Sequence, residues 1–378
     1  MRIVHIIVGL EVGGAELMLK RLVLSSQSNP ACQHCVISLT GVGVVGMEMK
    51  EAGVEVHALE LTSARAFPKA IWRLALLIRT LRPAVVQTWM YHADFLGGWV
   101  GWFLGCKVVW GIRSTGIPQG PASLTWWLIR VNAICSHFLP HKIICCADSA
   151  KKAHAALGFA ARKMVVIPNG YDFSDFSYNQ ADRQQVRERT GFSESDIVIG
   201  VVGRFDALKD FQNFVLAAKF TALECPEARF LMVGRGLDVN NSVLRGWIAA
   251  EGLDEKFSLV GEQARVPVYL AAMDIFCLSS RQEAFPNVVV EAMAVGLPCV
   301  VTNAGDAAAI VGDLGWVIPV KNSVALGRGL VQACRLPASR RALIGQKSAQ
   351  QVRARYDIDS IRHQYESVYG ELTQCETQ

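Results

Sequence analysis

Two short segments in the second half of the chain carry residues that could bind a diphosphate and a sugar. Arg204 and Lys209 follow a buried β-rich run, and Glu283 and Glu291 lie eight residues apart. Two cations suit a diphosphate, Arg as a planar fork and Lys as a point charge. One carboxylate could take the sugar hydroxyls and the other the ribose hydroxyls. The same four residues could also be surface charges. The apolar sequence between the acids favours binding, because it places Glu291 among core-facing positions, where a carboxylate needs partners.

Two loops could add backbone donors to these side chains. Pro286 fits the first turn of a helix, so Glu283 should lie in the loop before that helix and Glu291 within it. Near the N-terminus, Gly13 and Gly14 precede another helical segment. Paired glycines allow close approach to a phosphate, and a helix N-terminus offers unpaired N–H groups. The spacing is not the dinucleotide fingerprint GxGxxG, and a tight turn without a ligand is an equal alternative.

Strand-like and helix-like segments alternate along the chain in two series. This alternation predicts parallel sheets with helices on both faces, where ligands bind at the carboxyl ends of the strands. The divide falls near Pro168–Gly170, and we expect domains at 1–170 and 171–355, with a last helix at 356–378 crossing back to the first domain. The predicted fold class is α/β, with two doubly wound Rossmann-like domains facing each other across a cleft. The predicted strands are Arg2–Ile7, Cys35–Leu39, Val54–Leu59, Ala84–Trp89, Lys107–Ile112, Lys142–Ala147, Met164–Ile167, Ile197–Gly203, Arg229–Gly234, Phe257–Val260, Asp274–Leu278, Pro298–Thr302 and Trp316–Pro319.

Composition predicts a cytoplasmic protein. The longest apolar stretch, Phe95–Cys106, is too short for a helical membrane span, and the N-terminus reads as a strand rather than a signal peptide. Eleven cysteines, an odd number, favour reduced thiols. Cys32 and Cys35 form a lone CxxC without a second ligand pair, so we expect two buried residues rather than a metal or redox site.

Charge and tryptophan are concentrated in the first domain. Residues 1–150 hold 13 Lys and Arg against 8 Asp and Glu, together with seven of the nine tryptophans. This combination predicts attraction to an anionic membrane surface, such as the inner leaflet, or to a lipid-phosphate acceptor, whereas nothing resembles a nucleic-acid-binding motif. The basic segment Arg65–Arg82 and the tryptophans at 99, 102, 126 and 127 are the candidates for docking. An ordinary amphipathic helix packed on its sheet is the alternative for that segment.

The motifs together resemble the retaining family 4 (group 1) glycosyltransferases of bacterial surface-polysaccharide synthesis, whose fold is called GT-B. Glu283 to Glu291 matches the E-x7-E element of that family, and Arg204 with Lys209 matches its diphosphate-binding pair. Further similar segments are Gly13–Glu16, Thr88–Asp94, Trp110–Arg113 and Pro168–Asp172. The resemblance covers essentially the whole chain. Two segments depart from it, Asp306–Ile310 and Gly234–Leu237, and the second leaves the preferred base open.

The resemblance implies a role for each matched residue. His92, Arg204, Lys209 and Glu283 are the implied catalytic residues, with Glu283 on the hydroxyls of the donor sugar. Glu291 would bind the ribose, and Gly13 and Gly14 would shape the donor pocket. The remaining implied donor-binding residues are Arg113, Asn169, Ala284, Phe285, Asn287 and Val288.

The expected reaction is metal-independent transfer from a UDP- or GDP-sugar to a saccharide acceptor on a lipid carrier, with retention and no cofactor. Asp357-Ile358-Asp359 has the letters of a DxD metal site, but it lies near the C-terminus and should begin the last helix. We expect front-face attack, because no carboxylate is available as a nucleophile. The alternatives are a sugar-nucleotide epimerase of the same fold and a non-catalytic nucleotide-binding assembly subunit.

Overall fold

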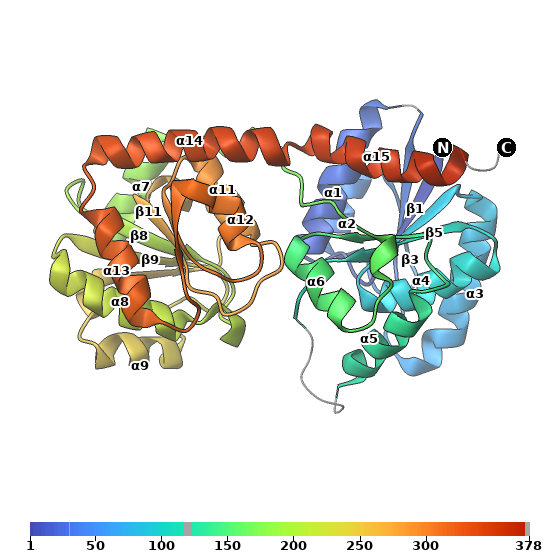
Figure 1. Cartoon of the computed structure of the whole chain (residues 1–378), viewed down its shortest axis with the longest axis horizontal. Helices are drawn as coiled ribbons and strands as arrows, with labels where there is room; N and C mark the ends of the chain where they lie inside the picture. Colours follow the sequence, from blue (N-terminus) through green and yellow to red (C-terminus); the bar gives the residue numbers. More distant parts are fainter. Residues whose placement is uncertain (30, 117–122, 375–378) are drawn as a thin grey trace. The chain divides into compact units, whose positions relative to one another are not determined.

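Each predicted strand becomes a strand of one of two parallel sheets (Figure 1). The computed structural model describes residues 1–29, 31–116 and 123–374. The chain divides into two compact units: Met1–Asp172 together with the chain from Tyr356 onward, which we call unit 1, and Phe173–Arg355, which we call unit 2. The predicted fold class, two Rossmann-like α/β domains, is confirmed.

Unit 1 contains a seven-stranded sheet in the order β3-β2-β1-β4-β5-β6-β7. The strand order reverses between β1 and β4, which makes this the switch point where ligands of such sheets bind. Its strands are β1 (Arg2–Ile7), β2 (Gln33–Ser38), β3 (Glu55–Ala58), β4 (Val85–Trp89), β5 (Lys107–Ile112), β6 (Lys142–Cys145) and β7 (Met164–Val166), and its helices are α1 (Gly14–Ser25), α2 (Gly43–Glu51), α3 (Phe67–Leu81), α4 (Tyr91–Phe103), α5 (Leu124–Cys135), α6 (Asp148–Ala156) and α15 (Ile358–Gln374).

Unit 2 contains a six-stranded sheet in the order β10-β9-β8-β11-β12-β13, with its switch point between β8 and β11. Its strands are β8 (Ile197–Val202), β9 (Ala228–Val233), β10 (Phe257–Gly261), β11 (Ile275–Leu278), β12 (Cys299–Thr302) and β13 (Gly315–Ile318). Its helices are α7 (Gln180–Thr190), α8 (Phe211–Glu224), α9 (Ser242–Ala250), α10 (Val266–Ala271), α11 (Asn287–Val295), α12 (Ala307–Val311), α13 (Ser323–Cys334) and α14 (Ala338–Tyr356).

Alternating side chains of the central strands fill a core on each face of the unit 1 sheet. One face of the sheet packs against α1, α2 and α15, and the other against α3 and α4. On α3, the four residues Ala70, Leu74, Ile78 and Leu81 are buried at helical spacing. The apolar face of the segment Arg65–Arg82 is therefore that of an amphipathic helix packed on its sheet, which is the alternative to membrane docking. Each fully buried large side chain contributes about 1.5–3 kcal/mol to stability.

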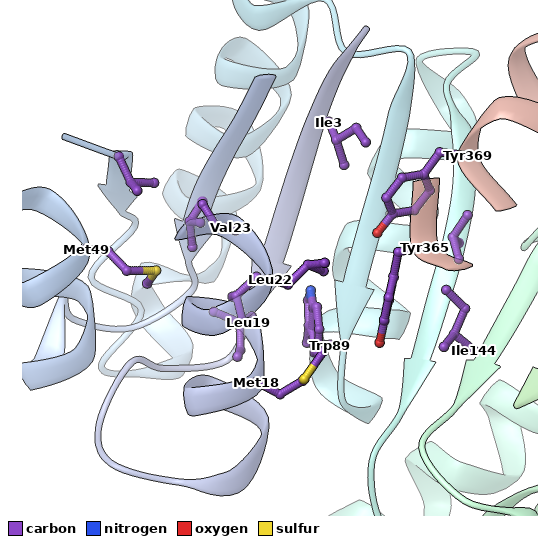
Figure 2. Packing of buried hydrophobic residues seen from close by; sticks show 14 of the residues in the cluster. Ile3, Met18, Leu19, Leu22, Val23, Met49, Trp89, Ile144, Tyr365 and Tyr369 are labelled. Atoms are coloured by element: carbon purple, nitrogen blue, oxygen red, sulfur yellow. The ribbon is translucent and has the colours of Figure 1, made fainter. Parts of the chain in front are cut away.

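The last helix completes the core of unit 1. Asp357 accepts hydrogen bonds from the backbone N–H groups of Asp359 and Ser360, each at 3.1 Å, and so caps α15 as predicted. Tyr365 and Tyr369 on this helix are buried beside Trp89 and Ile144 (Figure 2). The Tyr365 and Trp89 rings stack with centroids 6.2 Å apart. The final four residues of the predicted segment 356–378 lie outside the described residues.

The two cysteines of the CxxC segment belong to different cores. Cys32 packs on the side of the sheet that α1 and α15 cover, and Cys35 on the side that α3 covers. Both are buried. None of the helices in the described ranges combines the length and hydropathy that crossing a bilayer requires.

Trp89, His5 and His34 form a hydrogen-bonded chain in the core of unit 1. The donor at its first member determines which nitrogen of each imidazole carries the proton. The Trp89 indole, which can only donate, gives its N–H to Nδ1 of His5 at 3.1 Å. His5 must then carry its proton on Nε2 and donate to Nδ1 of His34 at 2.8 Å. The remaining N–H, on Nε2 of His34, is buried and has no hydrogen-bond partner among the described residues. Both imidazoles are therefore held in the neutral form.

This histidine pair should make unit 1 sensitive to acid. Burial, followed by the neighbouring His34, holds the pKa of His5 well below its usual value, and burial lowers the pKa of His34 to about 4. An unfolded histidine has a pKa of about 6.5, so the unfolded state binds more protons below that pH and stability falls as the pH drops. For His34 the loss should be on the order of 2 kcal/mol at about pH 5.

Urea unfolding at pH 8 and pH 5 measures this effect. We expect the His34→Gln variant to lose less stability between the two pH values than the wild type does. A His137→Gln variant, altered at an exposed histidine, should behave like the wild type. Equal pH dependence in the wild type and His34→Gln would contradict the assignment.

Candidate functional site

The candidate site in unit 2 lies where β8 and β11 end side by side at the switch point of the sheet. Parallel strands bring their carboxyl ends to the same edge, so the loop after β8 and the loop after β11 become neighbours. The first loop carries Arg204 and Lys209, and the second carries Glu283. Residues that are more than 70 positions apart in sequence therefore meet at one edge.

Lys209 and Glu283 form an ion pair at this edge. The Lys209 Nζ lies 2.6 Å from Oε1 of Glu283, and the Ser280 hydroxyl donates to the same oxygen at 2.7 Å. The Glu283 side chain is 12% exposed and that of Lys209 is 25% exposed. An ammonium and a carboxylate are thus held ready, one for an anion and the other for hydroxyl donors.

The backbone around Lys209 is fixed by its neighbours. Asp210 adopts the left-handed conformation (φ 51°, ψ 48°) and is buried, and its Oδ1 accepts a hydrogen bond from Arg281 at 2.6 Å. The Arg281 backbone N–H also donates to the carbonyl of Leu208 at 2.7 Å, and the Ser279 hydroxyl donates to the Lys209 carbonyl at 2.8 Å. Neither Asp210 nor Arg281 is among the site residues predicted from the sequence. These bonds tie the β8 loop to the β11 loop on both sides of Lys209.

The loop after β12 supports Glu283 from behind. Gly305 has a φ of 58°, and a Cβ added to it would lie 2.5 Å from the carbonyl oxygens of both Glu283 and Ala284. Asp306 donates its backbone N–H to the Ala284 carbonyl at 2.9 Å. Any side chain at position 305 would push the Glu283 backbone out of place, which explains the glycine.

Arg204 lies beside this pair, with an ion pair of its own. Its guanidinium donates to Oδ2 of Asp206 at 3.1 Å, and its side chain is 65% exposed. A backbone hydrogen bond from Leu208 lowers the pKa of Asp206, and the charges of Arg204 and Lys209 add to that shift. One aspartate therefore lies within electrostatic reach of both predicted cations, but only Lys209 bonds to Glu283.

Helix α11 begins one residue later than predicted. Pro286 is its N-cap rather than a residue of its first turn, and it contributes no capping side-chain bond. Asn287 and Val288 form the first turn, whose N–H groups point out of the helix end. Ala284 and Phe285, in the loop before it, are buried. Glu291 is half-buried rather than enclosed by core, because its position lies between the buried stripes of the helix.

In unit 1, the loops after β1 and β4 occupy the corresponding switch point. Gly13 is the N-cap of α1 and Gly14 its first residue. The Glu16 carboxylate lies over Gly13, where an added Cβ would be only 2.3 Å from Oε2. It accepts hydrogen bonds from the backbone N–H groups of Ala15 and Glu16, while burial raises its pKa. An anion of the protein itself therefore takes donors at this helix end, which the paired glycines alone do not indicate.

His92 is exposed in the first turn of α4, next to a strained residue. The surrounding protein displaces part of its hydration, which lowers the pKa of His92 below its usual value. Met90, the N-cap, has φ 74° and ψ 157°, a region that is nearly exclusive to glycine. Its N–H donates to the Gly111 carbonyl at 3.0 Å and its carbonyl accepts from Asp94 at 2.8 Å. The strain is thus held in place by both neighbouring elements.

Asp94 fixes the start of α4 from inside. Burial raises the pKa of Asp94 to about 8, although the hydrogen bond from Thr88 (2.6 Å) and that from the Gly111 backbone (3.3 Å) oppose the shift. Both bonds reach Oδ1, and no described residue bonds to the buried Oδ2. The signal that could have identified Asp94 from the sequence is an acidic residue in the first turn of an otherwise apolar helix that follows a strand.

Arg113 and Asn169 bond to each other at the far side of the unit 1 edge. The guanidinium donates to Oδ1 of Asn169 at 2.6 Å and to the Tyr365 hydroxyl at 3.0 Å, and it lies 4.8 Å from the centre of the Trp89 ring. Arg113 therefore holds α15 on the sheet through its hydrogen bond to Tyr365.

Two family models match the chain and together span most of it. The model described as Glycosyltransferase Family 4 matches residues 12–175, and the one described as Glycosyl transferases group 1 matches residues 182–350. These ranges contain every residue of the two switch-point edges described above.

Individual relatives and solved structures agree with these matches. The chain is 27% identical over 209 residues to an N-acetyl-alpha-D-glucosaminyl L-malate synthase of Bacillus anthracis (54% of each chain), and 32% identical over 145 residues to the UDP-Gal:alpha-D-GlcNAc-diphosphoundecaprenol alpha-1,3-galactosyltransferase of Escherichia coli (37% of each). It thus spans about half or less of these relatives. HepE from Anabaena, solved with UDP-glucose, superposes with a TM-score of 0.85 at 20% identity, covering 98% of this chain and 100% of HepE. This likeness confirms the predicted GT-B fold.

Substitution of Asp210 should separate its backbone role from its charge. Asp210→Val places a β-branched residue at positive φ and removes the bond to Arg281, so we expect a loss of about 2–3 kcal/mol of stability. Asp210→Asn tolerates the left-handed conformation and should cost less than about 1 kcal/mol. Urea unfolding of both variants tests this difference, and an equal cost would show that the backbone conformation imposes no constraint.

Proposed function

Because the chain belongs to the family 4, group 1, glycosyltransferases, we propose that it transfers a sugar from a nucleoside-diphosphate donor to a saccharide acceptor. The single observation that carries this proposal is the Lys209–Glu283 ion pair at the switch point of unit 2. A cation and a carboxylate, side by side at the ligand-binding edge, match the two halves of a sugar diphosphate.

Unit 2 holds the donor in this proposal. Lys209 and Arg204 bind the diphosphate, and the first-turn N–H groups of α11, at Asn287 and Val288, add donors. Glu283 accepts hydrogen bonds from the sugar hydroxyls, and Glu291 accepts them from the ribose. UDP or GDP is the expected nucleotide, and the structures of HepE with UDP and with UDP-glucose support the first.

The departing diphosphate gains negative charge as the glycosidic bond breaks. Lys209, Arg204 and the α11 N-terminus stabilise that charge electrostatically, without a metal ion. Of the two acids that spell DxD, Asp357 caps α15 and Asp359 forms an ion pair with Arg362 at 3.3 Å, so both are committed elsewhere. We propose attack from the face of the leaving group with retention of configuration, the departing oxygen accepting the acceptor's proton. His92, neutral at pH 7 because its pKa is lowered, is the unit 1 residue proposed to contact the sugar.

The acceptor is proposed to be a lipid-linked saccharide in the synthesis of a bacterial surface polysaccharide, such as O-antigen, capsule or exopolysaccharide. The names of several relatives support this class. They include the E. coli galactosyltransferase acting on a diphosphoundecaprenol-linked sugar, and LpsB of Rhizobium meliloti, a lipopolysaccharide core mannosyltransferase that is 29% identical over 145 residues.

An apolar surface on unit 1 fits an enzyme that takes a lipid-linked acceptor. We define the α4–α5 patch as Trp99, Trp102, Phe103, Leu124, Trp127, Val131, Ile134 and Phe138. Seven of its members are between 40% and 77% exposed. Leu124, Trp127, Val131 and Ile134 follow one another at intervals of three and four residues, which forms one stripe along α5. Phe138 lies just beyond the end of α5, and its ring centroid is 6.0 Å from that of Trp99 on α4, whose ring also stacks on Phe103 at 5.5 Å.

The segment that contains the patch is basic in sequence, which suits an anionic bilayer. Residues 95–147 contain four Lys and Arg but no Asp or Glu, and Arg130 lies on α5 itself, 5.1 Å from the centre of the Trp126 ring. Aromatic side chains bordered by basic ones are typical of surfaces that dock at lipid headgroups. We therefore propose peripheral docking at the inner leaflet of the cytoplasmic membrane through this patch. The exposed side chains of α3, among them Trp72, are the competing surface.

Donor binding and transfer test the proposed function directly. A thermal-shift screen with UDP-, GDP- and ADP-sugars should raise the melting temperature for one base, because a ligand that binds the folded state stabilises it. With that donor and a lipid-linked saccharide extract, transfer should persist in a chelator and give the donor's anomeric configuration. Epimerised donor without acceptor transfer would favour the epimerase alternative, and a covalent glycosyl adduct would contradict front-face attack.

Lys209→Ala and Glu283→Ala should each abolish most transfer without unfolding the protein. Loss of one transition-state contact costs about 2–4 kcal/mol, which corresponds to a decrease of roughly 30- to 1,000-fold in kcat/KM. Because the two side chains bond to each other, the double variant should lose less than the sum of the two single losses. Initial rates measured at low donor concentration give these values.

The matched control is Arg335→Ala, which breaks an exposed ion pair with Glu224 in the same unit. This variant should transfer sugar at the wild-type rate. Near-normal turnover in both Lys209→Ala and Glu283→Ala, with folding confirmed by circular dichroism, would refute the site.

The docking surface predicts which residues membrane binding requires. At low salt, the wild type should float with vesicles containing an anionic phospholipid and not with zwitterionic ones. The double variant Trp127→Ser/Ile134→Ser should lose flotation. Leu223→Ser, an equally exposed apolar site in unit 2, should keep it. If Trp72→Ser abolishes flotation and the α5 variant does not, α3 is the docking surface, and absence of wild-type binding ends the proposal.

A further inference from the structure

Three metal-binding side chains meet at one edge of the unit 1 sheet, away from the switch point. Cys35 on β2 lies opposite Glu55 on β3, and Ile37 lies opposite His57. Because side chains alternate along a strand, Cys35, Glu55 and His57 project from the same face. The Cys35 sulfur, one carboxylate oxygen and one imidazole nitrogen all lie within 4.8 Å of one another. The Glu55 Oε1 and His57 Nε2 are already 2.9 Å apart.

We propose that these three side chains form a binding site for a divalent transition-metal ion of the zinc type. Thiolate, imidazole and carboxylate are the ligands that zinc takes in proteins, at about 2.0–2.3 Å, and three protein ligands leave a fourth position for water. Ligands of a tetrahedral ion at such distances are roughly 3.2–3.9 Å apart. Side-chain rotations at Glu55 and His57 would bring the three ligand atoms from within 4.8 Å of one another to these shorter separations.

The surroundings allow both entry and retention of the ion. Cys35 is buried in the apolar core under α3, which fixes its position. The side chains of Glu55 and His57 are 49% and 34% exposed, so the ion reaches them from solvent. On binding, the Cys35 S–H bond breaks, the Zn–S bond forms and the proton passes to the buffer. One thiolate and one carboxylate then balance the two charges of the ion.

The ion would join β3 to β2. β3 is the edge strand of the sheet, has only four residues and pairs with β2 alone. The cations close to these side chains have backbone or amide partners. Arg2 donates to the Leu81 carbonyl and to Gln33, each at 3.3 Å, and Arg73 donates to the Ala58 carbonyl at 3.3 Å. A metal that binds only the folded state adds stability in proportion to the logarithm of its concentration. This site is independent of the proposed sugar transfer, since none of its residues belongs to the switch-point edge.

Cobalt spectroscopy on the full chain, stripped of metal with a chelator, tests the site. One equivalent of Co²⁺ should give a thiolate-to-cobalt charge-transfer band in the near ultraviolet, and Zn²⁺ should displace it. Cys35→Ser should lose the band. Cys32→Ser, altered in the same segment but buried on the opposite face, should keep it. Glu55→Gln, at an exposed position, and His57→Ala, at a partly exposed one, should each weaken Co²⁺ binding at least tenfold.

Thermal unfolding gives a second readout that does not require the cysteine variant to fold. Zn²⁺ should raise the melting temperature of the wild type and of Cys32→Ser, and should not raise that of His57→Ala. The proposal is overturned if the band persists in folded Cys35→Ser, if it vanishes in Cys32→Ser alone, or if neither Glu55→Gln nor His57→Ala changes the affinity.

Discussion

The ion pair between Lys209 and Glu283 is the interaction on which the candidate site depends. It joins loops from two adjacent parallel strands, so it exists only because β8 and β11 are neighbours at the point where the strand order reverses. The positive charge of Lys209 and the negative charge of Glu283 neutralise each other until a ligand binds to one or both of them. A diphosphate can compete for the ammonium while sugar hydroxyls satisfy the carboxylate. The two groups are therefore oriented before a donor arrives, which is the condition for electrostatic stabilisation of a leaving group.

Much of the surrounding structure serves to hold that edge in position. The left-handed backbone at Asp210 and the close approach permitted by Gly305 fix the loops that carry the pair. Unit 1 repeats the principle at its own switch point, where Met90 is held in a conformation unfavourable for its side chain and Asp94 anchors the helix that bears His92. Met90 and Asp210, two of the five described non-glycine residues with positive φ, thus lie beside residues proposed for the chemistry, as expected of strain that persists only where neighbours enforce it.

Unit 1 combines a buried pair of histidines with an exposed apolar patch. The chain of Trp89, His5 and His34 leaves one buried N–H without a hydrogen-bond partner among the described residues. Two tyrosines of α15 pack beside Trp89, as Figure 2 shows. On its outer surface, the α4–α5 patch exposes apolar side chains that a protein surrounded only by water would seldom gather in one place. Residues 95–147 contain four Lys and Arg and no Asp or Glu, so much of the positive net charge of the chain lies in this segment.

Periodicity and loop position in the sequence were enough to predict all thirteen strands, the fold class and the loop position of Glu283, because strand and helix patterns are local and the carboxyl edge of a parallel sheet follows from topology. The sequence could not show that Lys209 bonds to Glu283 while Arg204 pairs with Asp206, because side chains in one loop can reach several partners. Nor could it show that Glu16 folds back over Gly13, or that Cys35 lies beside Glu55 and His57 while Cys32 packs in a different core. Strand register and packing decide such contacts, since they bring together residues whose separation in sequence carries no signal.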